Sequence, residues 1–203
     1  MKELLIATGN SGKVTELTAL LEGMGITLYS LRDFPDLSPV EEDGETFADN
    51  AIKKASAACQ ATGLPVIADD SGLMVDFLDG RPGVHSARYA GEGAGDAANN
   101  SKLLLELAGI SLERRTASFN CVIALCRPDA ECRTFSGELA GLILKEAVGS
   151  GGFGYDPLFM VPEYGKTLAE LPLEVKNRIS HRGRSFAKLK EYLFQDQQIK
   201  SNA

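Results

Sequence analysis

Short apolar runs alternate with amphipathic helical patterns along the first part of the chain. Apolar residues cluster at 4–7, 27–31 and 65–69, which is typical of strands. Between these runs, residues 14–24 and 47–59 place apolar side chains near helical spacing, which predicts two helices. Strands that alternate with helices indicate an α/β fold.

Longer apolar runs mark the second half. The strand patterns at 117–127 and 132–144 follow each other closely, which predicts a hairpin or a meander and therefore a mixed sheet. Further elements are expected as strands at 73–77 and 158–161 and as helices at 98–107 and from 179 or 185 through 193.

The predicted fold is α/β, with a mixed central sheet flanked by helices. Because no internal repeat or low-complexity linker interrupts the chain, residues 1–203 are expected to form a single two-lobed domain with a cleft between the lobes. The polar segment QDQQIKSNA, residues 195–203, is expected to be a frayed tail.

Composition indicates a globular protein in the cytoplasm. Of 203 residues, 44% are hydrophobic and 24% are charged, and no apolar stretch approaches the ~18 residues of a membrane span. The segment MKELLIATGN is too short in apolar residues for a signal peptide. The net charge of −7 argues against a general nucleic-acid binder. We therefore expect neither a nucleic acid nor a membrane as a partner.

The four cysteines form no C-x-x-C pair, and only two histidines could complete a zinc site with them. Cys121 and Cys126 lie in the strand-like run SFNCVIALC. We interpret them as small buried apolar residues in a reducing compartment.

The segment ATGNSGK lies between the first predicted strand and the first predicted helix. It is not a Walker A loop, because only two residues separate Gly9 from Gly12 and Val14 follows Lys13. Backbone N–H groups of a glycine-rich turn at a helix N-terminus, with a lysine beside them, still favour an anion. A plain strand–turn–helix connection with a solvated Lys13 is the alternative.

Two charged segments suggest a polyphosphate ligand and its metal. Residues 41–49 are rich in acid, whereas residues 175–190 carry six basic residues and no acid. Two solvated faces would explain these segments equally well. Asn50 and Lys54 are four residues apart, which places an amide and an ammonium group on one helical face.

Asp69 and Asp70 end the apolar run PVIA, and Ser71-Gly72 is expected to turn the chain sharply. Paired carboxylates there can hold a divalent cation or polarise a water molecule, although on a continuous strand only one would point into the cleft. The alternative is an Asx-type turn capped by Asp and Ser.

The segment GSGGFGYDPLF contains four glycines within residues 149–154. Such a loop lets the backbone approach a ligand, and Phe153 and Tyr155 could supply flat faces. A buried aromatic pair that fills the core is the alternative. His181 and Arg182 would offer hydrogen-bond donors beside this surface, and no nucleophile partner is evident for either histidine.

Taken together and in order, six segments resemble the inosine triphosphate pyrophosphatase family of XTP/dITP diphosphatases, which remove damaged purine nucleotides. The segments are ATGNSGK, EEDGETFADNA, ADDSGL, PGVHSARYAG, GGFGYDPLF and SHRG. The resemblance covers nearly the whole chain. It implies an elongated α/β structure with a deep cleft between two lobes, a homodimer, and magnesium-dependent hydrolysis of a nucleoside triphosphate to monophosphate and pyrophosphate.

The resemblance also implies roles for individual residues. Asp70 would be the general base with Ser71 beside it, and Glu42 and Asp70 would hold Mg²⁺, while a share for Glu41 or Asp69 stays open. The phosphates would be held by Thr8, Gly9, Asn10, Ser11, Gly12 and Lys13. The nucleotide, especially its base, would be surrounded by Phe153, Gly154, Tyr155, Asp156, Lys176, His181 and Arg182.

From the chemistry of the residues, Lys13 and Lys54 would neutralise charge on a leaving pyrophosphate. Two other functions stay open: a sensor or nucleic-acid-binding module that uses residues 175–190 without turnover, and a pyrophosphatase for modified pyrimidine nucleotides. The acid pairs favour an enzyme, because a sensor does not need them.

Overall fold

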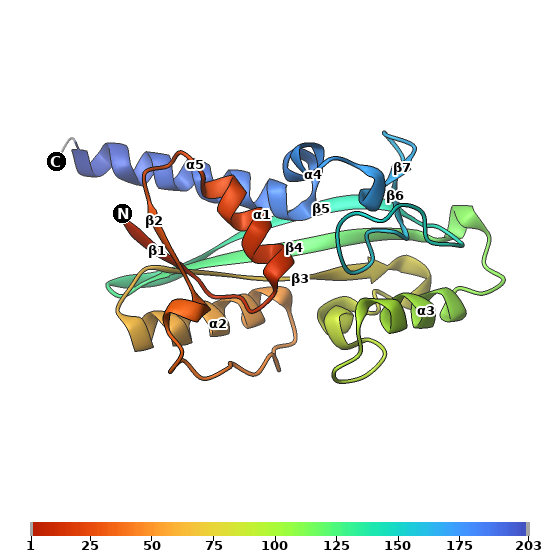
Figure 1. Ribbon diagram of the computed structural model, residues 1–203, viewed down its shortest axis with the longest axis horizontal. Coiled ribbons are helices and arrows are strands. Elements are labelled where there is room, and N and C mark those ends of the chain that lie inside the picture. Colours follow the sequence, from red (N-terminus) through yellow and green to blue (C-terminus); the bar gives the residue numbers. More distant parts are fainter. Residues whose placement is uncertain (1, 202–203) are drawn as a thin grey trace. The chain divides into compact units, whose positions relative to one another are not determined.

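The computed structural model describes residues 2–201 (Figure 1). Seven strands form one sheet in the order β2-β1-β3-β4-β5-β6-β7. The strands are β1 Glu3–Ile6, β2 Thr27–Ser30, β3 Val66–Val75, β4 Thr116–Arg127, β5 Ala130–Ile143, β6 Phe159–Val161 and β7 Lys166–Thr167. The helices are α1 Ser11–Leu21, α2 Phe47–Thr62, α3 Asp96–Glu106, α4 Leu173–Ile179 and α5 His181–Ser201.

The sheet is mixed, as the sequence predicted. Strand β1 pairs in parallel with β2 and β3, whereas β6 pairs antiparallel with β5 and β7. A two-residue connection joins the neighbouring strands β4 and β5. The predicted α/β class with a mixed sheet flanked by helices is therefore confirmed.

The chain divides into two compact units, and each is described by itself. The first unit comprises Met1–Asp70, Cys121–Gly137 and Arg182–Ala203, and the second comprises Ser71–Asn120 and Glu138–His181. Strands β3, β4 and β5 each contribute residues to both units. A cleft between two lobes stays a prediction.

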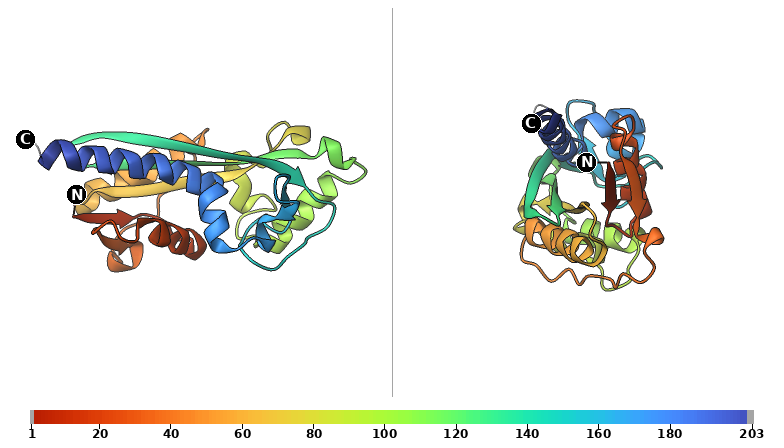
Figure 2. Two further views of the ribbon diagram at one scale, coloured as in Figure 1. Left: turned by 90° about the horizontal axis from the view of Figure 1, so that it is seen from above. Right: turned by 90° about the vertical axis from the view of Figure 1, so that its left-hand side faces the viewer.

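In the first unit, helices cover both faces of the strands. Leu17 of α1 and Phe186 of α5 pack with Ile67 on one face, and Ala51 of α2 packs with Ala68 on the other. Figure 2 shows α2 and α5 on opposite sides of the strands. Alternating side chains of β3 therefore meet different helices, as the two-residue period of a strand requires.

The second unit has its own core. Leu103 of α3 is fully buried, and it belongs to the same cluster as Leu73, Phe119 and Phe159. Phe119 and Phe159 lie with ring centroids 4.6 Å apart. The unit therefore buries enough apolar surface to hold its loops in place.

Two sequence expectations about the elements are corrected by the structure. Residues 65–69 and 73–77 were expected as two strands around a sharp turn, but β3 runs without interruption from Val66 to Val75. The turn prediction was wrong because Gly72, buried within the strand, was interpreted as a breaker. Residues 195–201, expected to fray, continue α5, and residues 202–203 lie outside the described part.

The cysteines differ in part from the interpretation. Cys121 is free and buried, as expected. Cys126 forms a disulfide with Cys132, because the short connection between β4 and β5 brings their Cα atoms within 4.2 Å. The reducing-compartment interpretation did not predict this bond.

Candidate functional site

The loop before α1 forms an exposed helix N-terminus. Asn10 is the N-cap of α1, and its side chain accepts a hydrogen bond from the backbone N–H of Lys13 at 3.2 Å. Gly9, Asn10 and Ser11 are exposed. Free N–H groups at a helix N-terminus favour a bound anion, so this loop is suited to phosphate.

Asp69 and Asp70 point to opposite faces of β3, because the strand continues through both. Asp69 is fully buried and faces α1 and α5, where Lys13 and Arg182 contact it. Asp70 faces α2, where Asn50 and Lys54 contact it. The two adjacent carboxylates therefore have different partners and different chemistry.

Asp69 is the centre of a buried charge network. Lys13 Nζ lies 2.9 Å from Asp69 Oδ2, and Arg182 Nε lies 3.4 Å from the same oxygen. Arg182 also pairs with the buried Glu16 of α1. Burial alone would raise the pKa of Asp69, but Lys13 and Arg182 hold that pKa well below its usual range. Asp69 is therefore an anion that fixes two cations.

Asp70 has the opposite electrostatic balance. Burial raises its pKa above the ordinary value, despite the opposing effects of Lys54 and of the hydrogen bond from Asn50. Asn50 Nδ2 donates to Asp70 Oδ2 at 3.0 Å. A carboxylate with a raised pKa is a better proton acceptor, which suits a general base.

Lys54 of α2 contacts both the acidic loop that carries Glu42 and the residues Asp69 and Asp70 of β3. Its ammonium group lies 2.7 Å from Glu42 Oε1, 2.7 Å from the carbonyl oxygen of Asp69 and 3.9 Å from Asp70 Oδ1. Three oxygens from three residues thus surround one cation.

The loop that carries Glu42 is fixed by Asn50. The backbone N–H of Gly44 donates to Asn50 Oδ1 at 2.8 Å, while the amide nitrogen of the same side chain holds Asp70. A Cβ atom at Gly44 would lie 2.7 Å from Asn50 Oδ1, so a larger residue does not fit. Asn50, which the sequence placed only on a helical face with Lys54, is therefore a central site residue.

In the second unit, the glycine-rich loop folds around Asp156. Lys176 Nζ lies 2.7 Å from Asp156 Oδ2, and both side chains are buried. The N–H of Phe153 donates to the same oxygen at 3.1 Å. Gly152 has φ = 75°, and a Cβ there would lie 2.0 Å from Asp156 Oδ2. Only glycine allows this close approach.

The aromatic residues of this loop differ in their surroundings. The hydroxyl group of Tyr155 donates to the carbonyl oxygen of Ser86 at 2.8 Å, and its ring is part of the core. Phe153 is half-buried, with Lys176 Nζ 5.6 Å from its ring centroid. Phe153 is therefore the better candidate for a flat binding face, whereas Tyr155 supports the loop.

His181 is also in the second unit. Its ring stacks on Phe119 with a centroid distance of 4.7 Å and an interplanar angle of 10°. It is 6% exposed. This stacking fixes the orientation of the imidazole ring and therefore the directions in which its two nitrogens point.

The predicted site residues fall into two groups. The first unit contains Thr8, Gly9, Asn10, Ser11, Gly12, Lys13, Glu42, Lys54, Asp70 and Arg182. The second contains Ser71, Phe153, Gly154, Tyr155, Asp156, Lys176, His181. Contacts join Lys54 to Glu42 and Asp70, and Lys176 to Asp156. Lys176 and Arg182 are buried and paired, so the solvated-face alternative is wrong for both.

Glu16, which pairs with Arg182, was not among the predicted site residues. Within α1 it interrupts a helical face next to Leu17, and both side chains are buried. A charged residue on the apolar side of a helix was the available signal, because a buried charge needs a partner.

The donors around Lys54 fit a magnesium ion. Glu42, Asp70 and the carbonyl oxygen of Asp69 are hard oxygen ligands, and they already surround the Lys54 cation. Within the described part of the chain, no group of three or more His, Cys, Asp or Glu side chains could hold a metal ion. Mg²⁺ commonly uses one or two carboxylates together with substrate phosphates and water, so two carboxylates are sufficient.

The sheet and this charge arrangement define an α/β protein whose polar site is suited to anionic ligands. The Ham1 family model matches residues 4–192, and the chain belongs to the Ham1 family. This result confirms the resemblance found in the sequence.

Relatives and solved structures match nearly the full length. The dITP/XTP pyrophosphatase of Geobacter sulfurreducens is 61% identical over 193 residues, 95% of this chain and 97% of the relative. That of Geobacillus kaustophilus is 54% identical over 191 residues, 94% of each chain. The Ham1 protein of Staphylococcus aureus has a TM-score of 0.87 at 42% identity, covering 96% of this chain and 100% of that chain.

A further solved structure carries an enzyme name. The nucleoside-triphosphatase or dITP/XTP pyrophosphatase of Mycobacterium abscessus has a TM-score of 0.76 at 44% identity, over 92% of this chain and 98% of that chain.

None of the helices within residues 2–201 is long and apolar enough to cross a membrane.

Proposed function

We propose that the protein hydrolyses deaminated purine nucleoside triphosphates, namely ITP, dITP and XTP, to the monophosphate and pyrophosphate. It is a nucleoside triphosphate diphosphatase, as the names of relatives up to 61% identical support. The observation that carries the chemistry is the cation of Lys54 between Glu42 and Asp70. Removal of these nucleotides from the cellular pool follows as the role of the reaction.

The first unit binds the triphosphate. The exposed helix N-terminus at residues 9–11 and the ammonium groups of Lys13 and Lys54 neutralise its oxygens. Asp69 and Arg182 hold Lys13 in place through the buried network. Preorganised cations stabilise the charge that develops on the leaving pyrophosphate.

Asp70 accepts the proton of the attacking water. Its position beside Lys54, away from the Lys13 and Arg182 cations that enclose Asp69, favours this role, and Asn50 orients its carboxylate. The oxygen donors of Glu42 and Asp70 would hold Mg²⁺, which would polarise the phosphate oxygens when bound. Lys54 would then move its contact from Glu42 to the phosphates.

The second unit recognises the base. Phe153 stacks on the purine, and His181, Lys176 or loop N–H groups donate to the 6-oxo oxygen that hypoxanthine and xanthine share. Adenine has an amino group at this position, so this hydrogen-bond donor would face the donor of the protein and no hydrogen bond would form. We include in the proposal a homodimer and a cytoplasmic location.

A screen of nucleoside triphosphates with pyrophosphate detection tests this function. ITP, dITP and XTP are expected to give monophosphate and pyrophosphate only when Mg²⁺ is present. Direct release of inorganic phosphate, without added pyrophosphatase, would contradict the proposal. Binding of the nucleotides without turnover would favour a sensor, and preferred turnover of modified pyrimidine nucleotides would favour the other enzyme class.

Neighbouring lysines of α2 provide a matched pair for this screen. Lys54→Ala is expected to lower kcat/KM for ITP by about 10² or more, because it removes a partly buried cation from the proposed phosphate site. Lys53 is more exposed and pairs with the exposed Asp43 at 2.5 Å. Lys53→Ala should therefore leave kcat/KM near that of the wild type. Equal effects of both substitutions would remove Lys54 from the site.

A further inference from the structure

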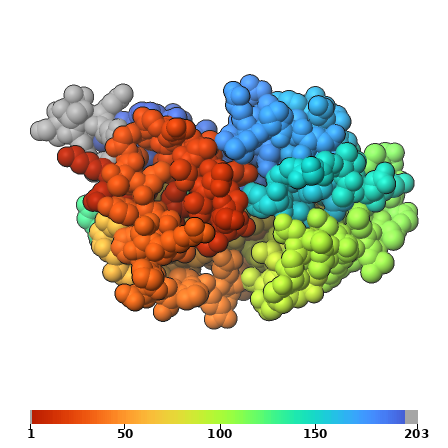
Figure 3. All heavy atoms as spheres, viewed as in Figure 1, coloured from red at the N-terminus to blue at the C-terminus, as the bar shows by residue number. Residues whose placement is uncertain are grey.

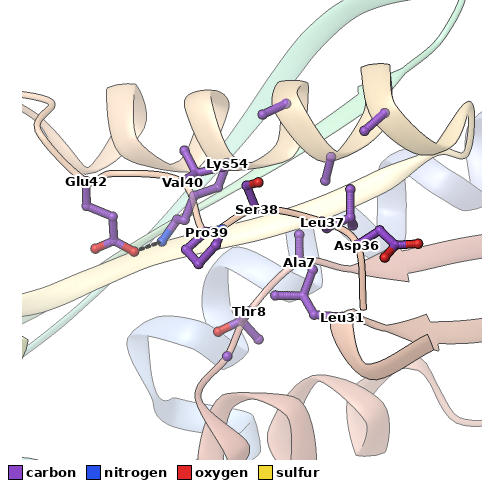
Figure 4. A pocket seen from close by; sticks show the side chains of 14 residues that line it. Ala7, Thr8, Leu31, Asp36, Leu37, Ser38, Pro39, Val40, Glu42 and Lys54 are labelled. Carbon is purple, nitrogen blue, oxygen red and sulfur yellow. Dashed lines mark hydrogen bonds and ion pairs between the residues drawn. The ribbon is translucent and has the colours of Figure 1, made fainter. Parts of the chain in front are cut away.

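A pocket of about 630 Å³ lies within the first unit, beside residues 8–10 before α1, which are called the phosphate loop below. One wall is formed by helix α2, where small side chains leave space at Ala58 and Ala61. The opposite wall comes from the irregular segment after β2, including Leu31, Leu37 and Val40 (Figure 4). Figure 3 shows this segment, in orange, at the molecular surface. The pocket is large enough for a ring-sized group.

The pocket is continuous with the polar site. Thr8 and Gly9 of the phosphate loop line it, and so do Glu42 and Lys54. Figure 4 shows the Glu42–Lys54 pair at one end, with Leu31, Leu37 and Asp36 toward the other. A phosphate held between Lys54 and Gly9 therefore has apolar surface directly beyond it.

The proposed reaction implies one orientation of the triphosphate along this surface. Asp70, which accepts the proton, does not line the pocket, whereas Lys54 and the start of the phosphate loop do. Under the proposed function, the attacked phosphorus would lie near Asp70, so the leaving pyrophosphate would extend away from it. Its terminal phosphate would then be the group that meets the pocket.

We propose that this pocket binds an apolar or aromatic group attached to the terminal phosphate, so that the enzyme also accepts nucleoside triphosphates esterified at that position. The proposal rests on the proposed function, because it uses the same phosphate loop. The apolar residues Leu31, Leu37 and Val40 and the alanines of α2 would contact the ester group.

The chemistry of the capped substrate is balanced without a co-reactant. A water oxygen forms a bond to the α-phosphorus, and its proton passes to Asp70. The bond from that phosphorus to the oxygen bridging the α- and β-phosphates breaks. The products are the nucleoside monophosphate and a pyrophosphate monoester that keeps the apolar group.

The test compares two esters of ITP, one with a phenyl and one with a methyl group on the γ-phosphate. Both carry the same charge, so they differ in apolar size alone. Burial of a phenyl-sized group is worth roughly tenfold to a hundredfold in binding. The phenyl ester is therefore expected to have a kcat/KM at least about tenfold above that of the methyl ester.

Helix α2 supplies a pocket-filling variant and its control. Ala61 is exposed and lines the pocket, so Ala61→Phe fills the space without disturbing the core. This variant is expected to lose the preference for the phenyl ester and to keep turnover of ITP. Gln60 is exposed on the same helix but lies outside the pocket lining. Gln60→Phe should keep the preference.

Three results would overturn the proposal: equal kcat/KM for both esters in the wild type, no turnover of either ester, or an unchanged phenyl preference in Ala61→Phe. Failure of the proposed function would be seen differently, as no turnover of ITP itself. Inhibition of ITP hydrolysis by phenyl pyrophosphate more than by methyl pyrophosphate gives a second readout, which does not depend on turnover of the esters.

Discussion

Asp69 and Asp70 are adjacent in sequence, but the structure gives them separate tasks. Asp69 is enclosed by Lys13 and Arg182, which hold its pKa low, whereas burial raises the pKa of Asp70. A carboxylate held as an anion by two cations is a poor proton acceptor. At the scale of the residue, the face of the strand therefore favours Asp70 over Asp69 as the proposed general base.

Asparagine substitutions at the two positions are expected to have different effects. Asp70→Asn should lower kcat by about 10² to 10⁴ and leave the melting temperature near that of the wild type, because it removes a general base. Asp69→Asn should lower stability, since it removes the buried anion that Lys13 and Arg182 share. Steady-state kinetics and thermal unfolding of both variants check this. Mild and equal losses of kcat would contradict the assignment.

Base recognition is tested at His181 and Arg182. His181→Ala should reduce the ratio of kcat/KM for ITP to that for ATP, because a required donor to the 6-oxo oxygen can be worth about 1–3 kcal/mol. Arg182→Ala should mainly lower the free energy of unfolding, because Glu16 and Asp69 lose a buried partner. Full selectivity in both variants would leave Lys176 and the loop N–H groups as the remaining donors.

At the scale of the element, the conformation of the glycine-rich loop depends on one close contact, between Gly152 and Asp156. Gly152 lies against Asp156, and the carboxylate of Asp156 also holds Lys176. The loop therefore has little freedom at this point, although its composition suggests flexibility.

Alanine at Gly152 should displace Asp156 and disrupt the pair with Lys176. We expect the KM for ITP to rise by about tenfold or more, as measured by steady-state kinetics. Gly165 is the control, because it also has a positive φ of 59° but has open space where a Cβ would lie. Gly165→Ala should cost only about 1–2 kcal/mol of stability, from its φ angle, and leave KM unchanged. A normal KM for Gly152→Ala would show that the close approach is dispensable.

Periodicity predicted most elements, because β1, α1, β2, α2, β4, β5 and α5 have sustained apolar patterns. Strand β7 was missed, since Lys166–Thr167 is too short to show a period. The pairing of Lys13 with Asp69 and of Glu16 with Arg182 could not be predicted, because it depends on how α1, β3 and α5 pack. Motif resemblance supplied residue roles that spacing alone left open.

At the scale of the whole molecule, three strands cross the boundary between the two units. The boundary falls between Asp70 and Ser71 in β3, between Asn120 and Cys121 in β4, and between Gly137 and Glu138 in β5. Each strand is one hydrogen-bonded element, so neither unit can unfold without breaking strands that serve the other. Unfolding is therefore expected to be a single cooperative transition.

Substitutions in α3 test this cooperativity. Leu103→Ala removes a fully buried side chain of the second unit and should cost about 2–5 kcal/mol. Calorimetry should show one transition, lowered by roughly 4–20 °C. Leu105, on the same helix, is 75% exposed, so Leu105→Ala should leave the melting temperature nearly unchanged. Two separate transitions, of which only one responds to Leu103→Ala, would contradict the expectation.

The continuous course of β3 also restricts where residues can be inserted into the chain or deleted from it. Adding or removing one residue between Val66 and Asp69 would turn every later side chain of the strand to the other face. The general base would then face Lys13 and Arg182, and the buried anion would face Lys54. Insertions and deletions should be tolerated in the exposed turn at 91–95 but not in this strand, even when they add only an apolar residue.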